Sequence, residues 1–250
     1  MKKNTHIFGI RAIIEAVHAN EDIDKVFLQN GLKGNLSSEL ESLLREREIT
    51  YSFVPMEKLN RITKMNHQGA IASISPISFA NFEEIVDTKI ASNKTPLFLI
   101  LDHVTDVRNF GAIIRTAECT GVDAIIIPNK GGAPVNADTV KTSAGAVFNI
   151  PICKTPHIKD AIYYLQGSGV KVIAATEKTS QSIYEISLNE PIAIVMGSEN
   201  TGISSSVLKI TDELAMLPIK GKIESLNVSV ACGIFLYEVI RQRDYSLSPS

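Results

Sequence analysis

The sequence predicts an α/β protein in which a small N-terminal α/β unit precedes a larger domain built on a parallel sheet. In the C-terminal part, short apolar runs rich in Ile, Val and Leu alternate with helical segments, as in a parallel sheet covered on both faces. The first 77 residues also alternate between helical and extended patterns, over shorter segments. A mixed polar stretch between prolines separates the two parts. We therefore expect domains at 1–76 and 96–245, a linker at 77–95 and a flexible tail at 246–250.

The N-terminal unit shows one helical apolar period, over Gly9–Asn20, and a second helical pattern, over Ser37–Ile49, where Ser37 or Ser38 is the expected N-cap. A short helix is expected over 56–63, and strands over 24–29, 49–54 and 69–75. The linker holds at most a short helix near Phe82–Lys89.

In the larger domain, strands are expected at five apolar runs and helices between them. The expected strands are 96–101, 123–128, 169–176, 191–197 and 213–218. The expected helices are Asn109–Cys119, Val135–Ser143, Ile158–Gln166, Ser204–Ile210 and Asn227–Arg243.

Composition restricts the class of protein. No apolar run approaches the roughly 18 to 20 residues of a membrane span, and the N-terminus lacks the features of a signal peptide. The three cysteines form no CxxC pair, so we expect small core residues in a reduced, cytoplasmic protein. The five histidines have no metal-ligand spacing, and no metal is expected. A net charge of −2 argues against binding nucleic acid through bulk positive charge, although a local basic face would suffice for RNA.

Three polar, glycine-bearing loops follow apolar strands, within Leu101–Pro128, Val195–Ser204 and Leu217–Arg243. Loops at the ends of parallel strands meet at one edge of a sheet, so these segments predict one ligand site assembled from distant parts of the chain.

In the first loop, Asn109 can cap a helix that contains Arg115, and Gly111 allows close approach of another backbone. Arg115 lies among apolar residues and needs a partner. One interpretation is an ion pair with Glu118 or a side chain that extends to solvent; the other is an arginine held to meet phosphate or carboxylate.

Residues of the second and third loops can likewise be interpreted as structural, for example as helix caps, or as parts of a ligand site. Gly197 permits close approach of a ligand to the backbone, and Glu199 fits either a helix N-terminus or a site. Ser225 or Asn227 can cap the last helix. Around them, Leu217, Ile219 and Leu226 provide apolar walls against which backbone amides could bind an adenine edge. The chain contains no GxGxxG, GxxxxGK[ST] or GxSxG string, which disfavours the common nucleotide-binding folds and a nucleotide-dependent oxidoreductase.

Together the three segments resemble the motifs of the SpoU (TrmH) family of RNA ribose 2′-O-methyltransferases. The first matches N-x-G-A-x-x-R from Asn109 to Arg115, the second MGSE-N-x-G from Met196 to Gly202, and the third LP-I-x-G-x-x-x-SLNVSVA from Leu217 to Ala231. The N-terminal unit, with FGIRAIIEAV and NHQGAIA, is similar to the substrate-binding domain of two-domain members, especially the 23S rRNA guanosine-2′-O-methyltransferases.

The resemblance implies a SPOUT-type α/β domain threaded into a trefoil knot, an exception to the usual topology rules. It implies a homodimer with each active site at the subunit interface, and S-adenosylmethionine as cofactor without a metal. The implied cofactor residues are Thr176, Glu177, Gly197, Leu217, Ile219 and Leu226.

The resemblance also assigns roles at the reaction centre. Arg115 would lie nearest the ribose hydroxyl, as base or as orienting group. Asn109 would hold Arg115 or the ribose, and Glu199 would orient Arg115 or accept a hydrogen bond from the target. Ser225 and Asn227 would fix the loop and the nucleoside. The candidate RNA contacts are Lys220, Lys222, Arg11, Arg61 and Lys64, with Lys2 and Lys3 as further candidates.

The implied function is 2′-O-methylation of a guanosine in 23S rRNA. Two alternatives remain open: methylation of tRNA, and a non-catalytic RNA-binding protein of ribosome assembly on the same fold.

Overall fold

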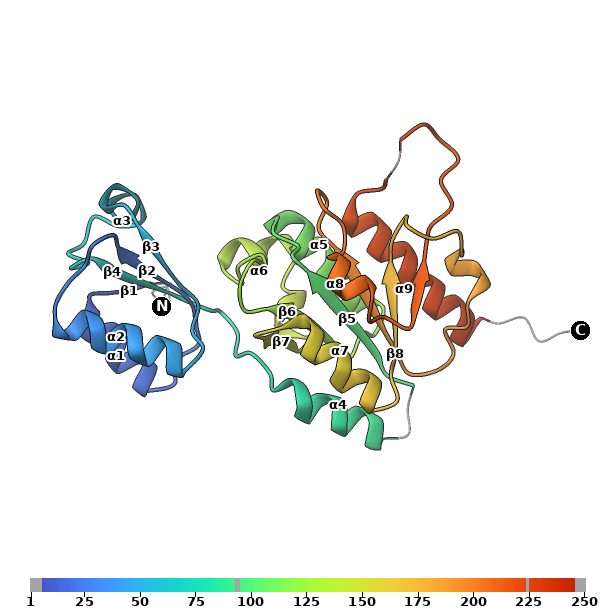
Figure 1. Cartoon of the computed structure of the whole chain (residues 1–250), viewed down its shortest axis with the longest axis horizontal. Helices are drawn as coiled ribbons and strands as arrows, with labels where there is room; N and C mark the ends of the chain where they lie inside the picture. The colour runs from blue at the N-terminus through green and yellow to red at the C-terminus, as the bar shows by residue number, and fades with distance from the viewer. Residues whose placement is uncertain (1–5, 93–94, 224, 246–250) are drawn as a thin grey trace, which may run out of the picture. The chain divides into compact units, whose positions relative to one another are not determined.

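The computed structural model describes residues 6–92, 95–223 and 225–245, so the predicted tail at 246–250 and Lys2 and Lys3 lie outside the described residues. The chain divides after Ser78 into two compact units, which are described separately (Figure 1).

The N-terminal unit is a four-stranded sheet with helices on both faces. The strand order is β1-β4-β2-β3, with β2 and β3 parallel and the other pairs antiparallel. The strands are β1 (His6–Phe8), β2 (Ile23–Gln29), β3 (Tyr51–Val54) and β4 (Ala70–Ile74). Helices α1 (Ile10–His18) and α2 (Asn35–Glu46) cover one face, and α3 (Met56–Ile62) lies on the other. Strand β1 was not predicted.

Helices α1 and α2 form because each carries an apolar stripe at helical spacing. Ile13 and Val17 on α1, and Leu40 and Leu44 on α2, are buried in one core with β2 and β4. The prediction of Ser37 or Ser38 as N-cap of α2 was wrong. Gly34 occupies that position without a side-chain cap, and Ser37 is buried inside the helix.

The second unit is built on a six-stranded, wholly parallel sheet in the order β10-β8-β9-β5-β6-β7. The strands are β5 (Leu97–Asp102), β6 (Ala124–Pro128), β7 (Ile152–Thr155), β8 (Lys171–Ala175), β9 (Ile192–Gly197) and β10 (Glu213–Ala215). The five predicted strands are present, whereas the edge strand β7 was not predicted. Strands β5, β6 and β9 are buried along their whole length, as their unbroken apolar runs require.

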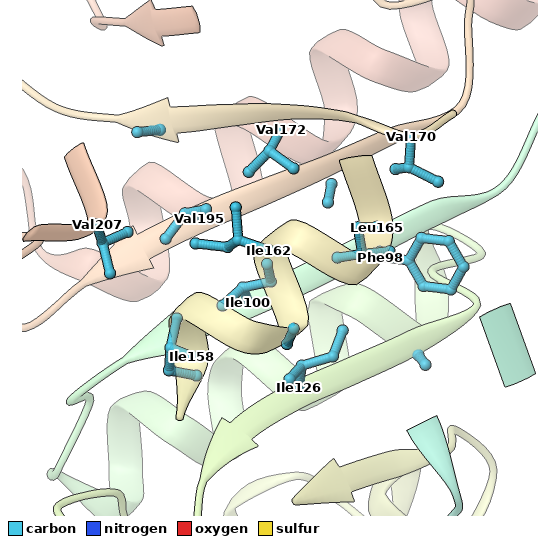
Figure 2. Close-up of a cluster of buried hydrophobic side chains, with 14 of the residues drawn as sticks. Phe98, Ile100, Ile126, Ile158, Ile162, Leu165, Val170, Val172, Val195 and Val207 are labelled. Atoms are coloured by element: carbon cyan, nitrogen blue, oxygen red, sulfur yellow. The ribbon is translucent and has the colours of Figure 1, made fainter. Parts of the chain in front are cut away.

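Helices cover both faces of this sheet. Figure 2 shows the core between α7 and the sheet, where Ile158, Ile162 and Leu165 of α7 pack on Ile100, Ile126 and Val195. On the other face, α5 packs against α9. The helices are α4 (Phe82–Ala91), α5 (Val107–Cys119), α6 (Ala137–Thr142), α7 (Ile158–Gly167), α8 (Ser205–Leu208) and α9 (Val228–Asp244).

The short helix expected near Phe82–Lys89 forms as α4, within the segment expected to be a linker, Ile77–Thr95. Asn81 caps this helix by accepting a hydrogen bond from the Glu84 amide at 3.1 Å. Val86 is fully buried in the core under α7, and the Tyr164 hydroxyl donates to Asp87 at 2.8 Å. These contacts make α4 part of the second unit.

The cysteines lie in two environments. Burial raises the pKa of the Cys153 and Cys232 thiols to about 12, so both are small core residues, as predicted. Cys119 is exposed, which corrects the expectation that all three are core residues. Across the described ranges, every helix is too short or too polar to cross a bilayer.

Gly111 sets the distance between α5 and α6. A Cβ atom at Gly111 would lie 2.0 Å from Thr142 Oγ1 and 2.8 Å from the Thr142 carbonyl carbon. The Thr142 hydroxyl donates to the carbonyl of Asp138 in its own helix at 2.9 Å and lies 3.2 Å from the carbonyl of Val107 on α5, so it cannot move aside freely.

We therefore predict that Gly111→Ala lowers the free energy of unfolding by about 2 kcal/mol or more, because a methyl group cannot enter this contact without a backbone shift. Urea denaturation checks this. Gly167→Ala, at the end of α7 with nothing within 4 Å of its Cβ position, is the matched control. The control should be neutral or slightly stabilising; equal effects of the two substitutions would contradict the close contact.

Candidate active site

A cavity of about 380 Å³ lies at the carboxyl ends of β8, β9 and β10. It is lined by residues that directly follow these strands and by the start of α9. The structure brings all six predicted cofactor residues to its walls: Thr176, Glu177, Gly197, Leu217, Ile219 and Leu226. Glu199 and Ser225 also line it.

Three polar side chains from the three predicted loops meet beside this cavity. Glu199 Oε1 accepts hydrogen bonds from Asn109 Nδ2 at 2.7 Å and from Asn227 Nδ2 at 2.6 Å. Asn227 Nδ2 also lies 3.1 Å from Asn109 Oδ1. We call these three residues the Glu199 cluster. Asn109 precedes Glu199 by 90 residues in the chain, and Asn227 follows it by 28.

Helix caps position two members of the cluster. Asn227 caps α9, where its Oδ1 accepts a hydrogen bond from the Ser229 amide at 3.0 Å. Its side-chain nitrogen, Nδ2, donates to Glu199 Oε1. Asp106, not Asn109 as expected, caps α5 by accepting from the Asn109 amide at 2.8 Å. The Asn109 side chain is therefore not needed for capping and can donate to Glu199.

Glu199 projects from a tight turn after β9. Ser198 and Gly202 exchange backbone hydrogen bonds of 3.1 and 2.9 Å across this turn. The next helix, α8, has Ser204 at its N-cap, so capping does not explain Glu199.

Gly197 has a different role from the one expected. A Cβ atom there would lie 2.2 Å from both the Gly202 carbonyl carbon and the Ile203 nitrogen. The chain's own backbone therefore occupies the space that the sequence suggested for a ligand. Gly197 still lines the cavity, but the absence of its side chain serves the fold of the Glu199 turn.

Asp102, which ends β5, was not predicted as a site residue. Its carboxylate is 1% exposed; Oδ2 accepts from the Ser204 amide at 2.8 Å and Oδ1 lies 2.5 Å from His103 Nδ1. Asp102 therefore connects the end of β5 to the end of the Glu199 turn. A lone carboxylate closing an apolar strand was the sequence signal that could have identified it.

Arg115 is exposed on α5 and has no hydrogen-bond or ion-pair partner among the described residues. The alternative ion pair with Glu118 is not formed among the described residues, and Glu118 Oε1 accepts a hydrogen bond from Asn149 Nδ2 at 3.5 Å. Among the described residues Arg115 makes no bond to Asn109 or Glu199, which leaves the other partners expected for these two side chains, the ribose and the target nucleoside. Six residues along a helix rotate a side chain by about 240°, so Arg115 and Asn109 leave α5 in different directions.

The predicted RNA contacts that fall within the described residues are all exposed. Lys220 and Lys222 lie in the loop that follows β10, next to cavity residue Ile219. Arg11, Arg61 and Lys64 lie in the N-terminal unit. Within the part of the chain that the structure describes, there is no group of three His, Cys, Asp or Glu side chains that could hold a metal.

The cavity fits a nucleoside-bearing cofactor. Its volume is in the range of ligand sites, and Leu217, Ile219 and Leu226 give it apolar walls. Within the described loop, the backbone groups of Ile219–Ile223 make no hydrogen bond to the rest of the backbone, so they are free to bind a base edge.

Comparison with known proteins follows the division seen in the structure. The SpoU rRNA Methylase family model matches residues 96–237. A second model, RNA 2′-O ribose methyltransferase substrate binding, matches residues 6–80.

Relatives match over nearly the whole chain. A 23S rRNA (guanosine-2′-O-)-methyltransferase, RlmB of Vibrio parahaemolyticus, is 35% identical over 96% of this chain and 98% of its own. A putative TrmH family tRNA/rRNA methyltransferase of Bacillus subtilis, YacO, is 30% identical over 97% of this chain and 98% of its own. An AdoMet-bound rRNA methyltransferase from Sinorhizobium meliloti superposes with a TM-score of 0.61 at 25% identity, covering 95% of this chain and 87% of that one.

The fold and the site thus define an RNA methyltransferase of the SPOUT class. The chain belongs to the SpoU (TrmH) methylase family, and both of its units match that family's two-part layout.

Asn227 offers a test of the Glu199 cluster that separates capping from cluster bonding. We predict that Asn227→Ala lowers the free energy of unfolding by about 1 kcal/mol through loss of the cap. Asn227→Asp keeps the cap but places a second carboxylate against Glu199. Repulsion raises the folded-state pKa of one carboxyl, so this variant should lose stability relative to wild type as pH rises from about 4 to about 7. Thermal unfolding measured across pH checks both; a pH-independent difference for the Asp variant would contradict the cluster.

Proposed function

We propose that this protein transfers a methyl group from S-adenosylmethionine to the ribose 2′-hydroxyl of a guanosine in 23S rRNA. The observation that carries the proposal is the Glu199 cluster, which joins the three family motifs at the wall of a cavity suited to the cofactor.

The cofactor, when bound, supplies a methyl group activated by a positive sulfonium. The apolar walls and the free backbone groups of the loop after β10 would hold its base, and Thr176 and Glu177 present polar groups at the end of β8. Positioning contributes much of the rate in such a transfer, because the oxygen must approach the methyl carbon in line.

Glu199 is arranged to orient the target nucleoside. Its Oε1 receives two amide donors, whereas Oε2 has no partner among the described residues and can accept a hydrogen bond from the target. The amides of Asn109 and Asn227 keep the carboxylate in place. Ser225, on the cavity wall, would help to fix the nucleoside.

Arg115 is best suited to orient the acceptor. Its guanidinium stays protonated in proteins, which makes it a poor base but a strong donor to phosphate or hydroxyl oxygen. Because it is exposed and has no partner in the described chain, it can meet an incoming RNA without breaking a bond.

Two findings support rRNA over tRNA as substrate. The relative from Vibrio parahaemolyticus, named for 23S rRNA, matches both units. The tRNA-modifying enzyme of A. aeolicus superposes on only 64% of this chain. The relative from Bacillus subtilis carries a tRNA/rRNA name, so tRNA is the second candidate. A non-catalytic role is disfavoured by the intact Glu199 cluster.

We also propose a homodimer in the cytoplasm, with the C-terminal part of the fold threaded as a trefoil knot. Val230 and Tyr237 are each more than half exposed and share one face of α9. Val230 follows Asn227 by three residues, so an interface on that face would border the Glu199 cluster. Free thiols at Cys119, Cys153 and Cys232 suit a reducing compartment.

We predict that Arg115→Ala lowers the rate of methyl transfer about 100-fold or more, because one charged donor at the acceptor is lost. Affinity for the methyl donor, measured by calorimetry, should stay within about twofold. Arg108→Ala, which removes an exposed arginine from the same helix, is the control. Loss of donor binding in the Arg115 variant would place Arg115 in the cofactor site instead.

Ribose-methylation mapping of total RNA, from cells with and without this protein, tests the substrate. We expect one signal to disappear, at a guanosine of 23S rRNA. A signal lost from tRNA would establish the second candidate, and an unchanged map in both RNAs would refute the proposed activity.

A further inference from the structure

The N-terminal unit has a hollow of its own, of about 380 Å³, between α3 and the loop that leads into β4. Its walls come from the end of β2, from α3 and from Lys64–Gly69. This hollow belongs to neither the cofactor cavity nor the Glu199 cluster.

Side-chain amides dominate the walls of the hollow. Gln29, Asn60, Asn66 and Gln68 all line it, and within the described residues none of their amide nitrogens donates a hydrogen bond to the protein. An amide presents a donor and an acceptor side by side, which matches the edge of a nucleobase. These walls therefore offer several base-binding groups that the fold does not use.

The loop that carries these groups is held rigidly. His67 is 6% exposed; its Nδ1 accepts from the Gly69 amide at 3.1 Å, which leaves Nε2 to donate to Asn60 Oδ1 at 3.1 Å. Gln68 and Gly69 both have positive φ, of 49° and 79°. A Cβ atom at Gly69 would lie 2.8 Å from Leu32 Cδ1. A strained turn locked by a buried histidine is preorganised, and preorganisation favours ligand binding.

The charge of the hollow selects an anionic partner. Its lining includes Lys64 and no carboxylate. Lys64 is exposed and has no ion-pair partner in the described chain, so it can bind a phosphate without losing another contact. Met56 and Met65, at 40% and 64% exposed, add flexible apolar surface beside the amides.

We propose that this hollow binds one unpaired nucleotide of the RNA substrate, with the amides on the base edge and Lys64 on the adjoining phosphate. The inference rests on the proposed function, since it assumes an RNA substrate. A paired base already uses its Watson–Crick edge, and the deep, narrow major groove of A-form RNA hides its Hoogsteen edge, so an unpaired base offers these amides the most hydrogen-bonding groups.

The test uses the full-length protein and fluorescein-labelled RNA hairpins, either fully paired or carrying one bulged nucleotide, with each of the four bases in turn. We expect the wild type to bind its preferred bulged hairpin about tenfold more tightly than the paired one. Gln29→Glu and the more exposed Gln68→Glu replace an amide donor by a carboxylate of the same shape and should reduce this ratio to about twofold or less.

Lys64 is tested through salt dependence. Lys64→Ala should lower the slope of log Kobs against log salt by about one, as expected for one lost phosphate contact, and Lys64→Arg should restore it. Arg47→Ala, which removes an equal charge at the C-cap of α2 on the opposite face of the sheet, should leave the slope unchanged.

The proposal is overturned if paired and bulged hairpins bind equally to the wild type, if both glutamate variants keep the preference, or if Arg47→Ala matches Lys64→Ala. Methyl-donor affinity, measured in the same samples, reports separately on the proposed activity. Failure of donor binding with the bulge preference intact would refute the activity alone; normal methyl transfer with no bulge preference would refute the hollow alone.

Discussion

The parallel pairing of β5, β8, β9 and β10 is the constraint on which the rest of the site depends. Parallel strands point their carboxyl ends to one edge, and the register pairs Asp102 at the end of β5 with Gly197 at the end of β9. Residues that follow strands far apart in sequence are thereby brought together. The Glu199 cluster forms at this edge because Asn109 lies in the first turn of α5 and Asn227 caps α9, and these two helices pack together on one face of the sheet.

Close backbone packing makes this convergence possible. Gly197 lets the Glu199 turn fold back onto β9, and Gly111 lets α6 lie against α5. In both places the missing side chain makes room for the protein itself rather than for a ligand. A glycine in a functional motif is therefore not by itself evidence of ligand contact, and the atoms that a Cβ would meet decide between the two interpretations.

The sequence predicted the strongly periodic and uniformly apolar elements well, and short or context-dependent ones poorly. The five apolar strands and the helices α5 and α9 were found because each lies in a run long enough for its pattern to be distinctive; β10 itself has three residues, but it lies in the apolar run 213–218. Strands β1 and β7, of three and four residues, were missed because so short a segment carries no clear period. A helix was expected near Phe82–Lys89, but it was taken for part of a linker because the burial of α4 depends on Val86 meeting α7, a tertiary contact that no local pattern contains. The cap of α5 was assigned to Asn109 although Asp106 lies three residues earlier, and both residue types are good caps.

The polar side chains in and beside the two hollows are of two kinds: those whose hydrogen bonds are complete and those whose bonding capacity is unused. Asp102 and His67 are buried with their bonds made, and each fixes a loop. Glu199 Oε2 beside the cofactor cavity, and the amides of Gln29 and Gln68 in the hollow of the N-terminal unit, have no partner in the described chain and lie where a ligand can reach them. A buried polar group without a partner is costly, so folding selects for completed bonds in the interior. An accessible polar group on a rigid support carries no such penalty and can exchange water for a ligand, which is why the unused groups, rather than the buried ones, support the proposed RNA and cofactor sites.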